Sequence, residues 1–526
     1  MGIPSYYGTL VSKMPHAIQK KAPAAVSALV VDMNCMIYHV LREPKMLANP
    51  YPGELGRLAW ERKLQEEVCA YLQHIWRSAG SPAQVYVALD GVVPYAKIKQ
   101  QRFRRFRSAS SAATASVAIS AATASVATQA TWDTNAITPG TVFMKNMGDA
   151  LRTTGSKYGW IISDTDECGE GEHKVLRWML STPIKAGAIV VYGLDADLIL
   201  LCLLAGDKLG SEYPIFLMRE SMAFGKLVRR EGSTDVEVCF FQVAVLKQLL
   251  QRDVEWSRNQ FYDYIFGMTF CGNDFLPTGL SLRIRDDGHT ILLACLRDLW
   301  AANKHLVQFD EQGVARPNAA GLRYIAIWML KQEERLIVTN IKRKFSARHG
   351  PTDEDNIAII EKAEMPLVIV QDEHMKLRTD WQGTYARLAL GENSVEQRKV
   401  RVADFWRGWC WVLDYYQGRP VDLEWVYAAG YPPTWKDLAD FFVLPRTDDW
   451  QQRPILKPQE QLALVLPLSS WGLLLKTPYK SLPTQMPQYW PQSFSLETFG
   501  KRFGWECEPM IPMLTPERLR FKPSAL

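Results

Sequence analysis

Residues 188–199 read AIVVYGLDADLI, a run of Val, Ile and Tyr that is followed closely by two aspartates. A short apolar run without polar alternation is typical of a parallel strand that is buried on both faces. Residues 28–33 and 84–90 have a similar composition, and an aspartate lies within or at the end of each run. Segments of helical period, such as residues 58–76, lie between these runs. Because strands and helices alternate, residues 1–305 are predicted to form an α/β fold in which helices flank a mostly parallel central sheet.

The overall composition is that of a folded globular protein. The chain has 526 residues, of which 47% are hydrophobic and 22% are charged, and this excludes a small stapled scaffold and a largely disordered chain. Its 61 Lys and Arg residues exceed its 56 Asp and Glu residues by only 5, so net charge alone does not indicate a nucleic-acid partner. Apolar runs stay well below the ~18 residues that a membrane span needs, so we expect no transmembrane helix.

The N-terminal sequence and the cysteines predict an intracellular protein. The chain begins MGIPSY, without the basic and apolar segments of a secretion signal. Its nine cysteines are scattered and form no C-x-x-C pair, which argues against both a disulfide framework and a zinc knuckle. A reducing compartment fits this usage, with the cytoplasm favoured and the nucleus as the alternative.

Composition changes along the chain predict a core, a second region and a tail. Residues 108–131 carry no charge and contain the octapeptide SAATASVA twice, so we interpret them as a low-complexity insertion, either an Ala-rich helix or a flexible segment. Trp, Tyr and Pro become frequent after about residue 405, which indicates an aromatic-rich second region. With a boundary near residue 305, residues 1–305 form the core, 306–515 the second region and 516–526 a C-terminal tail.

Seven acidic residues follow the predicted strands or lie in short glycine-containing motifs: Asp32, Asp90, Glu170, Glu172, Asp195, Asp197 and Asp274. Residues two apart on an extended segment point the same way, so the Glu170/Glu172 and Asp195/Asp197 pairs can each present two carboxylates to one site. Clustered carboxylates require cations, and oxygen ligands suit Mg²⁺ or Mn²⁺. Two such ions ~3.5–4 Å apart can activate water and stabilise the leaving oxygen of a phosphodiester. Any single one of these acids can instead be a helix cap or a solvated loop residue, but this alternative is weaker for all seven together.

A strongly basic helix is predicted directly after the strand that ends at Asp90. Residues 97–107 carry six cations and no acid. Four side chains share one face of this helix: Lys97, Gln101, Arg104 and Arg105. The forked guanidinium group of arginine and the compact charge of lysine together suit a terminal phosphate. The alternative is that these residues form a solvated charged face or a nuclear-import patch. The nearby acidic residues favour the phosphate-binding interpretation.

Seven motifs in this order resemble the Xrn family of 5′→3′ exoribonucleases: MGIP (1–4), VDMN (31–34), ALDGV (88–92) with AK (96–97) and QQRFRRFR (100–107), NAITPGT (135–141), GEGEHK (169–174), YGLDADLI (192–199) and GNDFLP (272–277). The likeness continues into the second conserved region of that family through WCWVLDYY (409–416) and KPQEQL (457–462). It covers the chain to about residue 515. The sequence therefore resembles a compact member that carries the two conserved N-terminal regions.

The resemblance implies a PIN-like nuclease core and a mainly helical second region. It also implies two bound Mg²⁺ ions, for which Mn²⁺ can substitute, and processive 5′→3′ hydrolysis of single-stranded RNA with a 5′ monophosphate to 5′ mononucleotides, in RNA and mRNA decay. By motif position, the seven acids would be the catalytic metal ligands. Lys97, Gln101, Arg104 and Arg105 would form the 5′-phosphate pocket.

Family members also stack the first bases between a His and a Trp, an arrangement that is indifferent to sequence. In this chain Tyr38 occupies the position of that His, and His39 follows it. Trp411 is favoured over Trp425 as the opposing ring. The alternative is that these aromatic side chains belong to the core.

Two further departures from the family pattern lie near the predicted site. Cys35 replaces a Gly that is common after the Asp-Met-Asn motif, and Tyr95 stands where a basic residue is usual. The second departure implies a lower positive charge in the phosphate pocket.

Two other functions remain as alternatives. A structure-specific DNA nuclease of the flap-endonuclease type would share the opening Met-Gly-Ile and the clustered acids, but no helix-hairpin-helix segment is evident. A catalytically inactive RNA-binding scaffold on the same fold is disfavoured because all seven acids are present. As partners we expect single-stranded RNA with a 5′ monophosphate and a decapping or pyrophosphate-removing enzyme, no membrane, and a monomeric protein.

Overall fold

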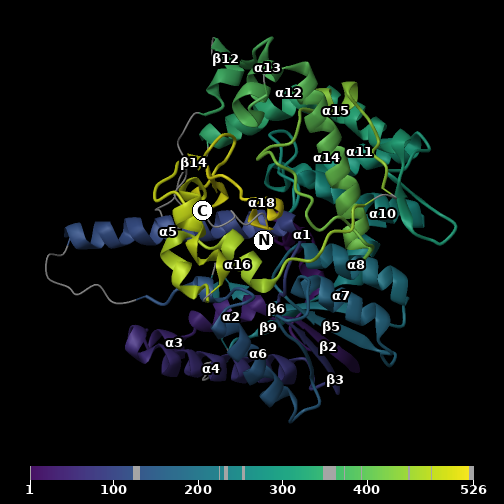
Figure 1. Cartoon of the computed structure of the whole chain (residues 1–526). Coiled ribbons are helices and arrows are strands. Elements are labelled where there is room, and N and C mark those ends of the chain that lie inside the picture. Colours follow the sequence, from purple (N-terminus) through teal and green to yellow (C-terminus); the bar gives the residue numbers. More distant parts are fainter. Residues whose placement is uncertain are drawn as a thin grey trace. The chain divides into compact units, whose positions relative to one another are not determined.

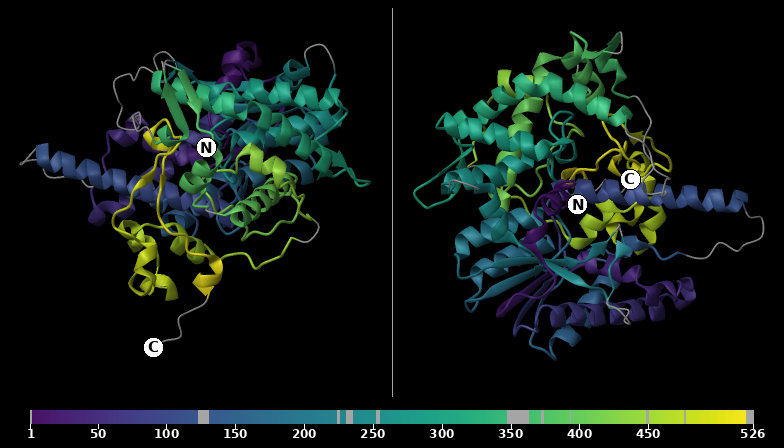
Figure 2. Two further views of the ribbon diagram at one scale, coloured as in Figure 1. Left: turned by 90° about the horizontal axis from the view of Figure 1, so that it is seen from above. Right: turned by 180° about the vertical axis from the view of Figure 1, so that it is seen from behind.

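The structure is a computed structural model that describes residues 2–122, 131–223, 226–229, 235–251, 255–346, 363–371, 374–392, 394–447, 450–475 and 477–520. The chain divides into two compact units, and each is built from separate stretches of sequence. The first, which we call the sheet unit, contains Leu10–Arg252, Pro454–Gln492 and Pro512–Leu526. The second, the helical unit, contains Met1–Thr9, Asp253–Arg453 and Ser493–Ile511. Figure 1 labels many of the elements of both units, and Figure 2 shows the chain from two further directions.

A seven-stranded sheet with the strand order β1-β9-β6-β5-β2-β3-β4 lies at the centre of the sheet unit. Its strands are β1 (Ile18–Gln19), β2 (Val26–Asp32), β3 (Gln84–Ala88), β4 (Ile161–Ser163), β5 (Ala188–Tyr192), β6 (Ile215–Glu220) and β9 (Val238–Gln242). The strands from β6 to β4 run parallel, and β9 and β1 add an antiparallel edge. The predicted mostly parallel sheet is therefore confirmed, and β2, β3 and β5 are the three strands that the sequence indicated.

The parallel strands are largely apolar, as expected for a sheet that helices cover on both faces. Leu29 and Val31 of β2 belong to a core that includes side chains of α4 (Arg57–Ser78) and α6 (Val142–Gly155). Since successive strand residues point to opposite faces, Ala28 and Val30 face the other side, where α7 (Gly171–Ser181) and α8 (Asp197–Leu209) lie (Figure 1). The helices of this unit are α2 (Asn34–Leu41), α3 (Pro44–Leu47), α4, α5 (Tyr95–Ala122), α6, α7 (Gly171–Ser181), α8 (Asp197–Leu209), α9 (Val243–Gln251), α16 (Pro458–Val465), α17 (Leu482–Gln485) and α18 (Pro516–Arg520).

The strand order reverses between β2 and β5. From β2 the chain continues to β3 and β4 on one side, and it then returns to β5 and β6 on the other side. In open α/β sheets, ligands bind at the carboxyl ends of the strands beside such a reversal. Asp32 is the last residue of β2, and Asp195 follows the end of β5, so both lie at this edge.

The basic helix α5 packs on the C-terminal part of the sheet unit. The guanidinium of Arg102 is fully buried and donates a 2.7 Å hydrogen bond to the carbonyl of Leu464 in α16. It also donates to the carbonyl of Tyr489 and lies 4.4 Å from the centre of the Phe106 ring. The segment 454–492 therefore belongs to the sheet unit, although the sequence places it in the second region.

The predicted insertion at residues 108–131 begins as helix. α5 continues without a break from Tyr95 to Ala122, and Figure 2 shows its C-terminal part projecting away from the sheet. The Ala-rich helix is thus the correct alternative for residues 108–122. Residues 123–130 lie outside the described residues.

The helical unit is rich in aromatic side chains. Its helices are α10 (Arg258–Gly267), α11 (Gly288–Ala301), α12 (Ala319–Ser346), α13 (Trp381–Tyr385), α14 (Val395–Tyr416) and α15 (Trp435–Asp440), and α1 (Tyr6–Lys13) begins in it. Two-stranded pairs accompany them: β10 (Val307–Phe309) with β11 (Ala315–Pro317), β12 (Val368–Gln371) with β13 (His374–Leu377), and β14 (Leu496–Glu497) with β15 (Glu508–Pro509). Trp406, Trp409 and Trp411 of α14 are buried, and Trp409 stacks on Phe270 at 5.7 Å. A helical, aromatic-rich second region is confirmed, whereas the boundary near residue 305 stays a prediction.

All nine cysteines lie among the described residues and are free thiols. None of the described helices combines the length and the apolar composition that crossing a membrane requires.

Candidate metal centre and phosphate-binding helix

Six of the seven predicted carboxylates lie at one edge of the sheet unit: Asp32, Asp90, Glu170, Glu172, Asp195 and Asp197. They are close enough to interact electrostatically, because Asp90 and Asp195 raise the pKa of Asp32 and Asp197 raises that of Glu172. Asp274 lies in the helical unit, after the 3₁₀ turn Met268–Cys271. Its participation in the cluster stays a prediction.

The two carboxylate pairs lie at helix starts and not on extended segments. Glu170 is the N-cap residue of α7 and Glu172 lies in its first turn, whereas Asp195 precedes α8 and Asp197 is its first residue. The extended geometry that we inferred from sequence was therefore wrong. The physical consequence is favourable, because the positive ends of two helix dipoles face these carboxylates.

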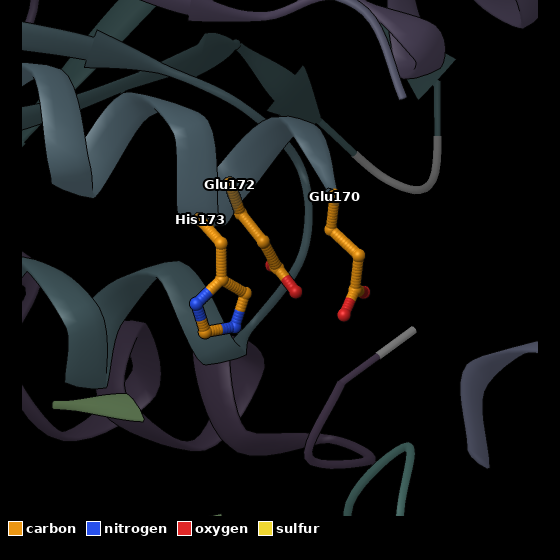
Figure 3. A group of neighbouring side chains, drawn as sticks. All are labelled: Glu170, Glu172 and His173. Atoms are coloured by element: carbon orange, nitrogen blue, oxygen red, sulfur yellow. The ribbon is translucent and has the colours of Figure 1, made fainter. Parts of the chain in front are cut away.

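Figure 3 shows the Glu170 and Glu172 carboxylates side by side, with the His173 ring next to Glu172. Ligand atoms of these three residues all lie within 4.8 Å of one another. All three side chains are buried, and Glu170 is only 2% exposed. Side chains that are this close and this buried can hold one metal ion.

Backbone and amide donors hold the Asp90 carboxylate in one orientation. Its Oδ1 accepts a 2.7 Å hydrogen bond from the backbone N–H of Gly171, and its Oδ2 accepts a 2.8 Å bond from the amide of Asn34. The Asn34 side chain also accepts from the backbone N–H of Asp90 at 3.2 Å. A Cβ atom at position 171 would lie 2.4 Å from Oδ1 of Asp32, so only glycine leaves room for that carboxylate.

Burial opposes the ionised form of these carboxyl groups. It raises the pKa of Asp32 well above its usual range, and the neighbouring Asp90 and Asp195 raise it further. Burial likewise raises the pKa of Glu172, against the lowering effect of Lys97. The Oε2 atom of Glu172 is buried and has no hydrogen-bond partner among the described residues. Such an orphaned oxygen fits a metal ion, because a bound cation would compensate a buried carboxylate oxygen that lacks a hydrogen-bond donor.

Two residues of the GEGEHK motif support the centre without having been predicted as site residues. Burial lowers the pKa of His173 to about 3, so its ring is neutral and can offer a nitrogen lone pair. Lys174 donates from Nζ to the carbonyls of Leu89 at 2.8 Å and Asp164 at 2.7 Å, and burial lowers its pKa to about 8. It thereby joins α7 to the end of β3. In the sequence, the GEGEHK motif is the signal that could have indicated both His173 and Lys174.

The basic helix contacts the carboxylates through Lys97. Its Nζ lies 2.6 Å from Oε2 of Glu170 and 3.8 Å from Oε1 of Glu172. The Lys97 side chain is 11% exposed, so these charges are largely shielded from water. The structure thus places the first residue of the predicted phosphate pocket directly beside the predicted metal ligands.

The other members of the predicted pocket occupy the same helix. Gln101 accepts a 3.3 Å hydrogen bond from Gln461 of α16. Arg105 is buried, donates twice to the hydroxyl of Thr138, and has its pKa lowered to about 10 by burial and by Arg104. Arg104 is partly exposed.

The departure at Tyr95 has a structural explanation. Its hydroxyl donates a 3.0 Å hydrogen bond to the carbonyl of Leu514, and the ring is buried. Tyr95 therefore anchors α5 and adds no charge to the pocket.

The three predicted stacking residues differ in their surroundings. Trp411 is 0% exposed, packs 4.7 Å from the ring of Tyr415 and donates to the carbonyl of Asp422, so the geometry favours its interpretation as a core residue. His39 packs 4.6 Å from the ring of Tyr71 and pairs with Glu43 at 3.0 Å. Tyr38 is partly exposed.

The fold and the cluster together define an α/β protein with a buried carboxylate centre beside a basic helix. Two family models match most of this chain: "XRN 5′-3′ exonuclease N-terminus" over residues 1–220 and "Xrn1 helical domain" over residues 372–524. The chain belongs to the Xrn family.

Curated relatives agree with the family models. A 5′-3′ exoribonuclease 2 of Arabidopsis thaliana is 24% identical over 99% of this chain and 66% of its own length. A 5′-3′ exoribonuclease 1 of Homo sapiens is 25% identical over 99% of this chain and 34% of its own length. A 5′-3′ exoribonuclease 2 of Eremothecium gossypii is 30% identical over 57% of this chain and 38% of its own length. The chain thus spans between about one third and two thirds of the length of these relatives.

Proposed function

We propose that this protein is a processive 5′→3′ exoribonuclease that hydrolyses single-stranded RNA with a 5′ monophosphate to 5′ mononucleotides. The observation that carries the proposal is the contact between Lys97 and Glu170 at 2.6 Å, which joins the basic helix to the carboxylate cluster. A terminal phosphate held by α5 would bring the first phosphodiester bond next to the cluster. Fixing a substrate in this way is a large part of hydrolytic catalysis.

The carboxylates are proposed to hold two Mg²⁺ ions, with Mn²⁺ as a substitute. The ligands would be Asp32, Asp90, Glu170, Glu172, Asp195 and Asp197, and the motif position of Asp274 adds it to this proposed set. When bound, such ions activate water and stabilise the leaving oxygen of a phosphodiester. The chain contributes the orientation of Asp90 by Asn34 and Gly171, and the neutral His173 beside Glu172.

Recognition of the 5′ end is assigned to Lys97, Gln101, Arg104 and Arg105. A terminal monophosphate carries more negative charge than a bridging phosphate, so charge-assisted bonds favour it over a 5′ hydroxyl. Of the aromatic candidates, partly exposed Tyr38 is the best placed to stack on a base. RNA with a 5′ monophosphate is produced when a cap or a pyrophosphate is removed from the 5′ end. An enzyme that decaps RNA or removes pyrophosphate would therefore supply the substrate, and the protein would act in RNA decay.

The direct test is an RNA with a 3′ label and either a 5′ monophosphate or a 5′ hydroxyl, incubated with the full chain in Mg²⁺. We expect rapid loss of the monophosphate RNA without a ladder of intermediates, while the hydroxyl RNA persists. Discrete internal cuts in both RNAs would instead indicate an endonuclease. RNA binding without cleavage would indicate an inactive scaffold.

A matched pair of variants tests the carboxylate centre. Glu172→Gln removes one charge and keeps the side-chain size, and we expect turnover to fall by more than the ~10–100-fold that is typical of changes around metal ligands. The control is Glu212→Gln, which changes an exposed glutamate of the same unit and should leave turnover unchanged. Equal activity of both variants would refute the assignment of Glu172.

A further inference from the structure

Lys97 belongs to two sites at once. Its ammonium lies 2.6 Å from Glu170 and 3.8 Å from Glu172, within the carboxylate cluster. Its place on α5, on the face shared with Gln101 and Arg105, also makes it part of the proposed phosphate pocket. A divalent cation on the same two carboxylates would repel the ammonium at this short distance, because little water is present to screen the charges.

Hydrogen bonds hold two other members of the phosphate pocket, Arg105 and Gln101, whereas the ammonium of Lys97 lies at the end of a flexible side chain. Arg105 is fixed by Thr138, and Gln101 is bonded to Gln461. A lysine carries its charge on a flexible four-carbon stem, so its ammonium can change partners without movement of the helix. The nearby Lys174 cannot replace it, since its Nζ is committed to two backbone carbonyls.

We propose that Lys97 is a positioning residue that alternates between the two sites. Without a divalent cation, its ammonium neutralises Glu170 and Glu172. A cation that binds these carboxylates releases the ammonium, which then binds the terminal phosphate of the RNA. This inference rests on the proposed function, because it takes the cluster as the metal centre and α5 as the phosphate-binding helix.

The consequence is positive coupling between the metal and the terminal phosphate. The metal displaces Lys97 and so completes the phosphate pocket. By linkage, a bound phosphate must strengthen metal binding by the same factor. Coupling between two sites in one protein is commonly about 5-fold to 150-fold in affinity.

The test measures Mn²⁺ binding to the full chain by water-proton relaxation, without RNA turnover. Titrations are made alone, with saturating adenosine 5′-monophosphate, and with adenosine. In the wild type, we expect the monophosphate to raise Mn²⁺ affinity about 5-fold or more, and adenosine to have no effect. Lys97→Met keeps the stem and removes the charge. It should bind Mn²⁺ more tightly than the wild type when no nucleotide is present, and it should lose the response to the monophosphate.

Lys99→Met is the matched control, because it removes a partly exposed charge from the same helix. It should retain the wild-type coupling. If Lys97→Met retained the coupling, metal and phosphate would affect each other directly, and the proposal that the metal releases Lys97 would be wrong. The proposal would also be wrong if Lys97→Met bound Mn²⁺ more weakly than the wild type or with the same affinity. If neither protein binds Mn²⁺, the metal centre fails and the proposed function fails with it, so the two failures are distinguishable.

Discussion

Asn34 holds Asp90 through a pair of hydrogen bonds, one to the carboxylate at 2.8 Å and one from the backbone N–H at 3.2 Å. Asn34→Ala removes both, while the Gly171 N–H still restrains one carboxylate oxygen. We therefore expect a folded protein whose turnover falls by roughly 10-fold to 100-fold. The Mg²⁺ concentration needed for half-maximal activity should rise, while KM for RNA stays unchanged.

Steady-state kinetics on the monophosphate RNA at several Mg²⁺ concentrations measures this effect. Asn49→Ala, which changes an asparagine outside the site, is the control and should leave the kinetics unchanged. A wild-type Mg²⁺ requirement in Asn34→Ala would show that Gly171 alone is sufficient to orient Asp90.

At the scale of single residues, the sequence predicted that the strand-end carboxylates share one edge of the sheet, but it did not predict the contacts that they make. The shared position of the carboxylates at the ends of β2, β3 and β5 could be predicted, because parallel strands bring their carboxyl ends to one edge. The Lys97–Glu170 pair could not, since it depends on how α5 and α7 pack in three dimensions. The burial of Trp411 could not be predicted from the sequence either, because an aromatic residue at helical spacing fits a core and a binding face alike.

Between elements, a buried carboxyl group of the helical unit joins α12 to α15. Glu333 accepts hydrogen bonds from the backbone N–H groups of Trp435 at 2.8 Å and Lys436 at 3.3 Å. Burial raises its pKa to about 8, whereas a glutamate in an unfolded chain titrates near ~4.3. The folded state therefore keeps a proton that the unfolded state has released. It follows that the stability contributed by Glu333 falls as pH rises from about 4.3 to about 8.

Glu333→Gln should remove this pH dependence, because its amide carries no charge at any pH. We expect the variant to gain thermal stability relative to the wild type as pH rises from 5 to 8, with a ceiling of about 1.4 kcal/mol per pH unit. Melting temperatures measured by circular dichroism at pH 5, 6, 7 and 8 check this. Glu311→Gln, an exposed change in the same unit, should follow the wild type at every pH. A constant difference between Glu333→Gln and wild type across this range would contradict the proton uptake.

Elements with a clear pattern of hydrophobic residues could be predicted from the sequence, whereas features that depend on long-range packing could not. The strands β2, β3 and β5 and the helix α4 are local features of apolar pattern, so the sequence predicted them. The helix starts at Glu170 and Asp197 were missed, since a pair of acids two residues apart has no period of its own. The attachment of α16 to α5 was also missed, because the contacting residues are separated by more than three hundred positions in the chain.

For the whole molecule, the predicted core and the compact sheet unit are different pieces of chain. The sheet unit includes Pro454–Gln492, which residues 1–305 lack. Without that segment, the buried guanidinium of Arg102 loses its acceptors on Leu464 and Tyr489. The backbone N–H of Val93 also loses its 3.0 Å bond to Gln461. A 1–305 fragment lacks all of these contacts, so it should be less stable than the full chain.

The Arg102→Met substitution distinguishes this cause from the general effect of truncation. In the full chain it removes a satisfied charge together with its hydrogen bonds, and it should lower the melting temperature. In the 1–305 fragment the same guanidinium is exposed to water and hydrated, so the substitution should change stability by no more than about 0.5 kcal/mol. This difference follows only if α5 and the 454–492 segment fold as one unit. A 1–305 fragment that melts like the full chain, with or without Arg102, would instead make the boundary near residue 305 a true domain boundary.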